Sequence, residues 1–83
     1  EMEYSQLFAL RIRQLCTTHK ITINKLASMS GLRQSTVDNI TEEPAKPKVK
    51  TLHKIAVTFN MTLGEFLDFP ELNDFPIEEN DVD

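Results

Sequence analysis

A short run of polar side chains in the middle of the chain has hydrogen-bonding groups that match the edges of nucleic-acid bases. Gln34 and Asn39 carry amides, which can pair bidentately with adenine, and Arg33 carries a guanidinium, which can pair with guanine. Ser35 can bond to several base edges, and Asp38 can accept from cytosine or orient Arg33 or Asn39. The same polar residues are also typical of an ordinary solvated helix face. Whether they could contact bases therefore depends on the structural element that carries them.

The residues around this run predict two short helices joined by a tight turn, over Thr22–Ile40. Two helices joined by three or four residues cross steeply, and Ala27 is small enough for the crossing point. Gly31 can take the positive φ that ends the first helix, and it lacks a Cβ that could clash where the chain reverses. The side chains expected to face the shared core are Leu26, Leu32, Val37 and Ile40. This arrangement leaves the polar run on the outer face of the second helix.

Helical spacing of apolar residues continues through most of the chain, and no strand alternation is present. Thr22 is expected to cap a helix that runs through Ser28, and the polar run belongs to a helix from about Arg33 to Thr41. Pro44 and Pro47 predict a loop over 41–48. The other expected helices are Tyr4–His19, Val49–Phe59, and one capped by Thr62 that includes Leu63, Phe66 and Leu67. The predicted fold class is all-α, with five helices.

The net charge of −4 hides an uneven distribution. Residues 1–64 hold all nine lysines and arginines against five acids, whereas residues 65–83 hold eight acids and no base. A mildly basic body is compatible with binding a polyanion. We therefore predict a domain over 1–69 and an acidic, flexible C-terminal tail over 70–83. Three apolar residues in the tail indicate a possible docking segment: Leu72, Phe75 and Ile77.

Several other classes of protein are disfavoured. The single cysteine, Cys16, cannot form an internal disulfide, which favours a cytoplasmic protein over a small secreted one. No apolar run reaches the length of a membrane span, so no membrane partner is expected. His19 and His53 lie far apart without ligand-spaced partners, so neither a metal nor a cofactor is expected. Motifs of phosphate loops, nucleophile elbows and zinc proteases are missing, which argues against an enzyme.

An ordered series of short motifs resembles the phage repressor and Cro-like helix-turn-helix family, also called the XRE family. The resemblance covers about residues 7–69 and implies a five-helix, lambda-repressor-like DNA-binding domain of a dimeric transcriptional regulator from a bacterium or phage. The residues that carry it are Arg11-Ile12-Arg13, Ile21-Thr22-Ile23-Asn24-Lys25-Leu26-Ala27, Ser30-Gly31-Leu32, Ser35-Thr36-Val37, Lys46-Pro47, Thr51-Leu52, Lys54-Ile55-Ala56, Leu63 and Glu65-Phe66-Leu67.

The resemblance also implies roles for individual residues. Base edges would be met by Gln34, Ser35 and Asn39, and Arg33 is placed with them. The expected phosphate contacts are Thr22, Asn24, Thr36, Lys46 and Lys48. Apolar residues near the end of the domain exceed what a small core needs, and they are the predicted dimer interface: Leu63, Phe66, Leu67 and Phe69.

Two functions from different classes follow. The first is a sequence-specific, double-stranded-DNA-binding transcriptional regulator, in particular a repressor, in which helix three enters the major groove and two copies read half-sites about 34 Å apart. The second is a protein-interaction module of the same fold, antitoxin-like or anti-repressor-like, with weak or no DNA binding. The second is favoured by Glu42 and Glu43, which would repel phosphate, and by the acidic tail, through which a protein partner could bind.

Overall fold

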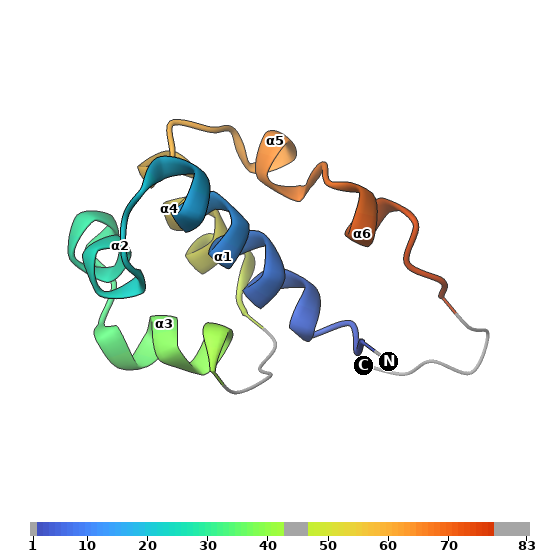
Figure 1. The fold of residues 1–83 in the computed structure, drawn as a ribbon, viewed down its shortest axis with the longest axis horizontal. Helices are drawn as coiled ribbons and strands as arrows, with labels where there is room; N and C mark the ends of the chain where they lie inside the picture. The colour runs from blue at the N-terminus through green and yellow to red at the C-terminus, as the bar shows by residue number, and fades with distance from the viewer. Residues whose placement is uncertain (1, 43–46, 78–83) are drawn as a thin grey trace.

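The computed structural model describes residues 2–42 and 47–77, and the described regular elements are all helices. They are α1 (Gln6–His19), α2 (Ile23–Ser30), α3 (Gln34–Thr41), α4 (Val49–Thr58), α5 (Leu63–Leu67) and α6 (Pro70–Asn73). Helix α1 runs through the middle of the molecule, with α2 and α3 on one side and α5 and α6 on the other (Figure 1). None of the described helices is long and apolar enough to cross a membrane.

The turn between α2 and α3 has the local chemistry that the sequence predicts. The Thr22 hydroxyl accepts from the Lys25 amide at 3.0 Å and caps the start of α2. Gly31 ends α2 with a φ of 74°, in the left-handed region. No atom lies within 4 Å of where a Cβ on Gly31 would stand, so the expected clash is wrong, and the positive φ alone explains the glycine. The short turn sets α3 against α2 in one orientation.

The end of α4 and the start of α5 are defined by a second turn. Asn60 has a φ of 58°, and the Met61 amide donates to the Ala56 carbonyl at 2.9 Å, which closes the end of the helix. Thr62 then forms a capping box with Glu65, in which the Thr62 hydroxyl accepts from the Glu65 amide and the Glu65 carboxylate accepts from the Thr62 amide. This double cap stabilises α5, which is too short to be stable alone.

The capping box makes the stability of the fold dependent on pH. Hydrogen bonds from Thr62 hold the pKa of the Glu65 carboxyl below its usual value. The carboxylate therefore contributes stability above its unfolded pKa, and this contribution is lost as the pH falls through the lower folded pKa. We expect Glu65→Gln to flatten the fall of the thermal midpoint between about pH 5 and pH 3. Thermal unfolding of the exposed-acid control Glu3→Gln should keep the slope of the parent chain, and equal slopes for both variants would contradict this role.

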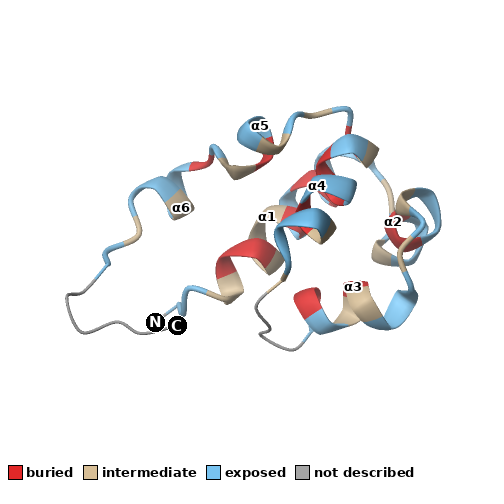
Figure 2. Cartoon of the chain, turned by 180° about the vertical axis from the view of Figure 1, so that it is seen from behind, coloured by how far each residue is buried: buried red, intermediate tan, exposed pale blue. Residues whose placement is uncertain are grey.

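The hydrophobic core is a single cluster formed by α1 to α5, as the buried faces in Figure 2 show. Leu26, Val37 and Ile40 are buried in it as predicted, and Leu32 packs against its edge. Ala27 is buried in the same cluster, and its place at the crossing of α2 and α3 stays a prediction. The core thus fixes the α2–α3 pair through its inner face and leaves its outer face free for function.

The segment after α5 contains an element that the sequence analysis did not predict. Pro70 begins the short helix α6, where its missing amide hydrogen costs nothing. Leu72 packs against the core, and the Phe75 ring lies edge-on to the Tyr4 ring at 5.5 Å. Residues 70–75 of the predicted tail therefore contact the domain. The proposed boundary at residue 69 and the flexibility of the tail stay predictions, and residues 78–83 lie outside the described part.

Candidate nucleic-acid interface

Helix α3 separates its side chains sharply between core and solvent. Its buried residues are Val37, Ile40 and Thr41. Most of the polar run is exposed, namely Arg33, Gln34, Ser35 and Asn39, while Thr36 and Asp38 are half-buried. The structure thus brings Gln34, Ser35 and Asn39 to the outer side of α3, with Arg33 next to them at its N-cap. An α-helix with its side chains is about 10–12 Å across, which fits the width of a B-DNA major groove.

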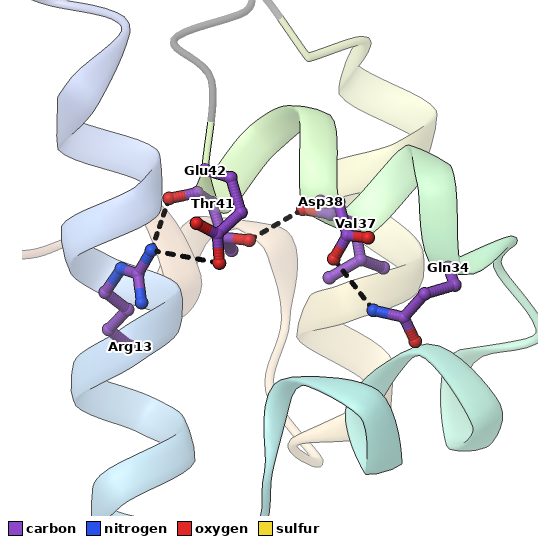
Figure 3. Close-up of polar contacts among 6 residues, drawn as sticks. All are labelled: Arg13, Gln34, Val37, Asp38, Thr41 and Glu42. Atoms are coloured by element: carbon purple, nitrogen blue, oxygen red, sulfur yellow. Dashed lines mark hydrogen bonds and ion pairs between the residues drawn. The ribbon is translucent and has the colours of Figure 1, made fainter.

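One hydrogen bond orders part of this outer face. The Gln34 side-chain amide donates to the Asp38 carboxylate at 2.8 Å, one helical turn away (Figure 3). This bond fixes the side-chain amide of Gln34 and leaves its carbonyl oxygen to accept from a ligand. Asp38 therefore orients Gln34 in this structure, a partner that was not among its predicted ones, which were a cytosine, Arg33 or Asn39.

Arg13 attaches α1 to the C-terminal end of α3. Its guanidinium donates to the Thr41 carbonyl and lies 3.9 Å from the Glu42 carboxylate (Figure 3). The Thr41 hydroxyl is turned inward and donates to the Val37 carbonyl at 3.0 Å. A carbonyl at a helix end has no partner within the helix, so Arg13 satisfies it and positions α3. Arg13 also offsets part of the negative charge that Glu42 brings to this end.

We expect Arg13→Ala to lower the free energy of unfolding by about 1–3 kcal/mol, because it leaves the Thr41 carbonyl without its charged donor. Urea unfolding measures this change. Arg13→Lys keeps the charge but loses the planar guanidinium group. Its free energy of unfolding should lie between those of the parent chain and the alanine variant. An alanine variant as stable as the parent would show that Arg13 does not hold α3.

The start of α2 can receive an anion. Helix geometry leaves the Ile23 and Asn24 amides without intrahelical partners, and the exposed Asn24 side chain lies beside them. The Thr22 hydroxyl accepts from Lys25, so its own hydrogen can still be donated outward. Free amides, a hydroxyl donor and the positive end of the helix dipole suit a phosphate group. Their contact with phosphate stays a prediction.

Of the two lysines predicted to contact phosphate, Lys48 lies within the described residues and Lys46 does not. Lys48 is exposed and stands at the N-cap of α4, close in sequence to the end of α3. Lys46 and Glu43 lie outside the described residues. Lys48 is thus the first lysine after α3 within the described residues.

The structure uses half of the predicted dimer residues inside the monomer. Phe66 is 0% exposed and Phe69 is 2% exposed, so neither has surface left for a second copy. Arg11 covers both rings, with its guanidinium 5.1 Å from the Phe69 centroid, and donates to the Glu65 and Phe66 carbonyls. The core therefore uses more of these apolar residues than the sequence analysis expected, and fewer are left for a dimer interface. Leu63 and Leu67 are half-buried and keep accessible surface.

Two arginines are positioning residues that sequence analysis missed. In the sequence Arg11 and Arg13 stand out only as part of the family motif, but in the structure Arg11 holds the end of α5 and Arg13 holds the end of α3. Their partners are backbone carbonyls 55 and 28 residues away, which no side-chain pattern reveals. The one signal in the sequence was the pair of arginines within one small amphipathic helix.

Comparison with known proteins identifies the family to which this helical arrangement belongs. The family model described as the Cro/C1-type HTH DNA-binding domain matches residues 11–71, which is most of the chain. The chain belongs to this family. The match confirms the resemblance seen in the sequence and the all-α fold class with a helix-turn-helix, which is the α2–α3 pair. The family consists of DNA-binding transcriptional regulators rather than enzymes.

Members of the family with curated names support this assignment. The chain is 27% identical over 66 residues to the HTH-type transcriptional regulator PuuR of Escherichia coli (strain K12), covering 80% of this chain and 36% of PuuR. It therefore spans about a third of that relative. It is 34% identical over 58 residues to the SPbeta prophage-derived uncharacterized HTH-type transcriptional regulator YopO of Bacillus subtilis (strain 168), covering 70% of this chain and 83% of YopO.

A solved structure has the same fold. The crystal structure of the prophage Lp1 protein 11 superposes with a TM-score of 0.78 at 30% identity, over 88% of this chain and 97% of that one. Two of these relatives are described as prophage proteins. The family, the fold and the presence of a DNA-binding helix-turn-helix are thereby established for this chain.

Proposed function

We propose that the chain is a sequence-specific, double-stranded-DNA-binding regulator that acts as a repressor, with α3 in the major groove. The observation that carries the proposal is the division of α3. Its inner face is buried, its C-terminal end is held by Arg13, and its outer face presents Arg33, Gln34, Ser35 and Asn39. A helix held this firmly can place amide and guanidinium groups against base edges with the accuracy that bidentate pairing needs.

The distribution of charge supports the same orientation. Four acids belong to α5, α6 or the residues that directly follow them, and these two helices lie on the opposite side of α1 from α3 (Figures 1 and 2). These acids are Glu65, Asp68, Glu71 and Asp74. The side that carries α3 has Lys25 and Arg33 exposed, with the open start of α2 beside them. DNA approaching the α2–α3 side therefore stays away from the acids of α5 and α6, and the acids it meets there are Asp38 and Glu42.

The proposed assembly is a homodimer on two half-sites about one helical turn of DNA apart. Leu63 and Leu67 are the residues of the predicted interface that retain surface for a second copy. Leu67 also lines an apolar groove of about 520 Å³, which it shares with Tyr4, Phe8, Val49, Leu52 and Leu72. In this proposal, repression results from occupancy of the operator by the dimer.

Titration of the chain against mixed duplex fragments at several salt concentrations tests DNA binding. A regulator should show log K falling linearly with log salt, with a slope near −0.9 for each phosphate neutralised. Failure to bind at low salt, together with a stable complex with another protein, would support the interaction-module alternative. That alternative is favoured by Glu42, whose exposed carboxylate adds negative charge at the end of α3.

Lys48→Ala should weaken binding to all duplexes alike and reduce the slope against log salt by about 0.9, because Lys48 is proposed to contact phosphate rather than a base. Fluorescence anisotropy with labelled duplexes measures both effects. Lys20→Ala is the matched control, since Lys20 is an exposed lysine at the end of α1. A Lys48 variant that binds like the Lys20 variant would remove Lys48 from the interface.

A further inference from the structure

A second groove lies between the C-terminal end of α2 and the exposed side of α4. It has a volume of about 550 Å³ and is lined by Met29, Ser30, Lys50, His53, Lys54, Val57 and Thr58. None of these residues belongs to α3, so this groove is separate from the outer face of the recognition helix. The spacing of the α4 residues at three and four places them on one continuous stripe of that helix.

The groove combines exposed apolar side chains with unpaired positive charge. Met29 is 52% exposed and Val57 is 62% exposed, so the groove offers apolar surface to a ligand. Lys50 and Lys54 lie beside them, and neither forms an ion pair with a carboxylate of residues 2–42 or 47–77. No acid lines the groove within these ranges. An apolar strip between basic groups fits a peptide segment that alternates acidic and apolar side chains.

We propose that this groove binds residues 77–83 of a second copy of the chain. That segment reads Ile-Glu-Glu-Asn-Asp-Val-Asp and carries four acids and two apolar residues, the complement of the groove. Ile77 is 70% exposed, so its side chain is available for such a contact. Two copies that exchange their acidic segments make the same contact twice, which gives a closed, two-fold pair.

Chain geometry favours a second copy over the chain's own segment. Phe75 lies against Tyr4, just before the start of α1, whereas the end of α1 meets the end of α4 through His19 and Phe59, 4.9 Å apart. The apolar part of the groove at Val57 is thus toward the opposite end of α1, a helix about 21 Å long. Six residues after Ile77 extend about 20 Å at most. These six residues would have to be fully extended to reach Val57 of the same copy. The same segment of a neighbouring copy can reach the groove without being extended in this way.

Peptide binding tests the groove directly. The probe is a synthetic peptide of residues 76–83, and the receptor is the ¹⁵N-labelled full chain with E78Q, E79Q, D81N and D83N, which removes competition by its own acids. We expect amide shifts confined to the end of α2 and to α4, with the Kd rising about tenfold between low and high salt. K50E/K54E in the receptor should abolish binding, and K50R/K54R should retain it.

Several outcomes would overturn the proposal. They are equal binding of a peptide with its acids neutralised, shifts centred on the groove at Tyr4 and Val49, or no shift at millimolar peptide. Sedimentation of the unmodified chain should show self-association, and the variant with E78Q, E79Q, D81N and D83N should lack it. The unmodified chain can also be compared with the variant that has the four acids replaced, without added peptide. Differences in the amide shifts of the groove that do not change with protein concentration would mean that the chain binds its own segment. A loss of DNA affinity in K50E/K54E that K50R/K54R restores, without peptide binding, would assign the groove to phosphate instead.

Discussion

Replacing Phe66 with alanine should lower the free energy of unfolding by about 3–5 kcal/mol. The ring is fully buried in the core beneath α1 and α4, and Arg11 lies over it at 5.9 Å. The substitution removes the buried apolar surface, leaves a cavity, and takes away the aromatic face that the guanidinium covers. A chain of this length has a total stability of about 4–12 kcal/mol, so the variant should lose a large share of it.

Phe75→Ala is the matched control for this prediction. It makes the same chemical change at a half-buried ring whose aromatic partner is Tyr4. We expect a loss of about 1 kcal/mol there, the value of one edge-on aromatic pair. Urea unfolding followed by circular dichroism measures both variants. Similar losses at the two positions would show that Phe66 is not part of the core, and would return it to the candidates for a dimer interface.

The combined substitution Gln34→Ala and Asn39→Ala should weaken specific DNA binding by about 2–6 kcal/mol, with each residue contributing about 1–3 kcal/mol. The two amides stand on the exposed face of α3, and Gln34 is already oriented by Asp38. Removing them deletes base pairing but leaves the phosphate contacts, so nonspecific affinity should change little. The preferred sequence should become less distinct at two positions of each half-site.

Gln14→Ala provides the control, because it removes an exposed side-chain amide from α1, away from α3. Competition binding, with a selected duplex against a scrambled one, separates specific from nonspecific affinity. The double variant should lose most of the ratio between the two duplexes, and Gln14→Ala should keep it. A double variant that keeps the full ratio would place base recognition outside α3.

Much of the fold was predictable because its determinants are local. Thr22, Gly31, Asn60 and Thr62 set helix ends through bonds and angles that involve only their neighbours. The buried side of the α2–α3 pair follows from spacing alone. Because the buried side is fixed by spacing, the position of the polar run on the opposite, outer face of α3 is predictable as well.

The rest depends on contacts between segments far apart in the chain. Arg11 and Arg13 bind backbone carbonyls, which any residue can offer, so the sequence contains no sign of their partners. The burial of Phe66 and Phe69 depends on how closely α1 and the segment after α4 approach. Helix α6 is four residues long, too short for periodicity to reveal.

Selection of duplexes from a random pool tests the central claim, that the outer face of α3 reads DNA sequence. The parent chain should enrich one motif, arranged as two related half-sites about 10 base pairs apart. The Gln34→Ala and Asn39→Ala variant should lose the enrichment at positions within each half-site while still retaining duplex at low salt. A bound pool with the same composition as the input, for the parent chain at low salt, would contradict the claim.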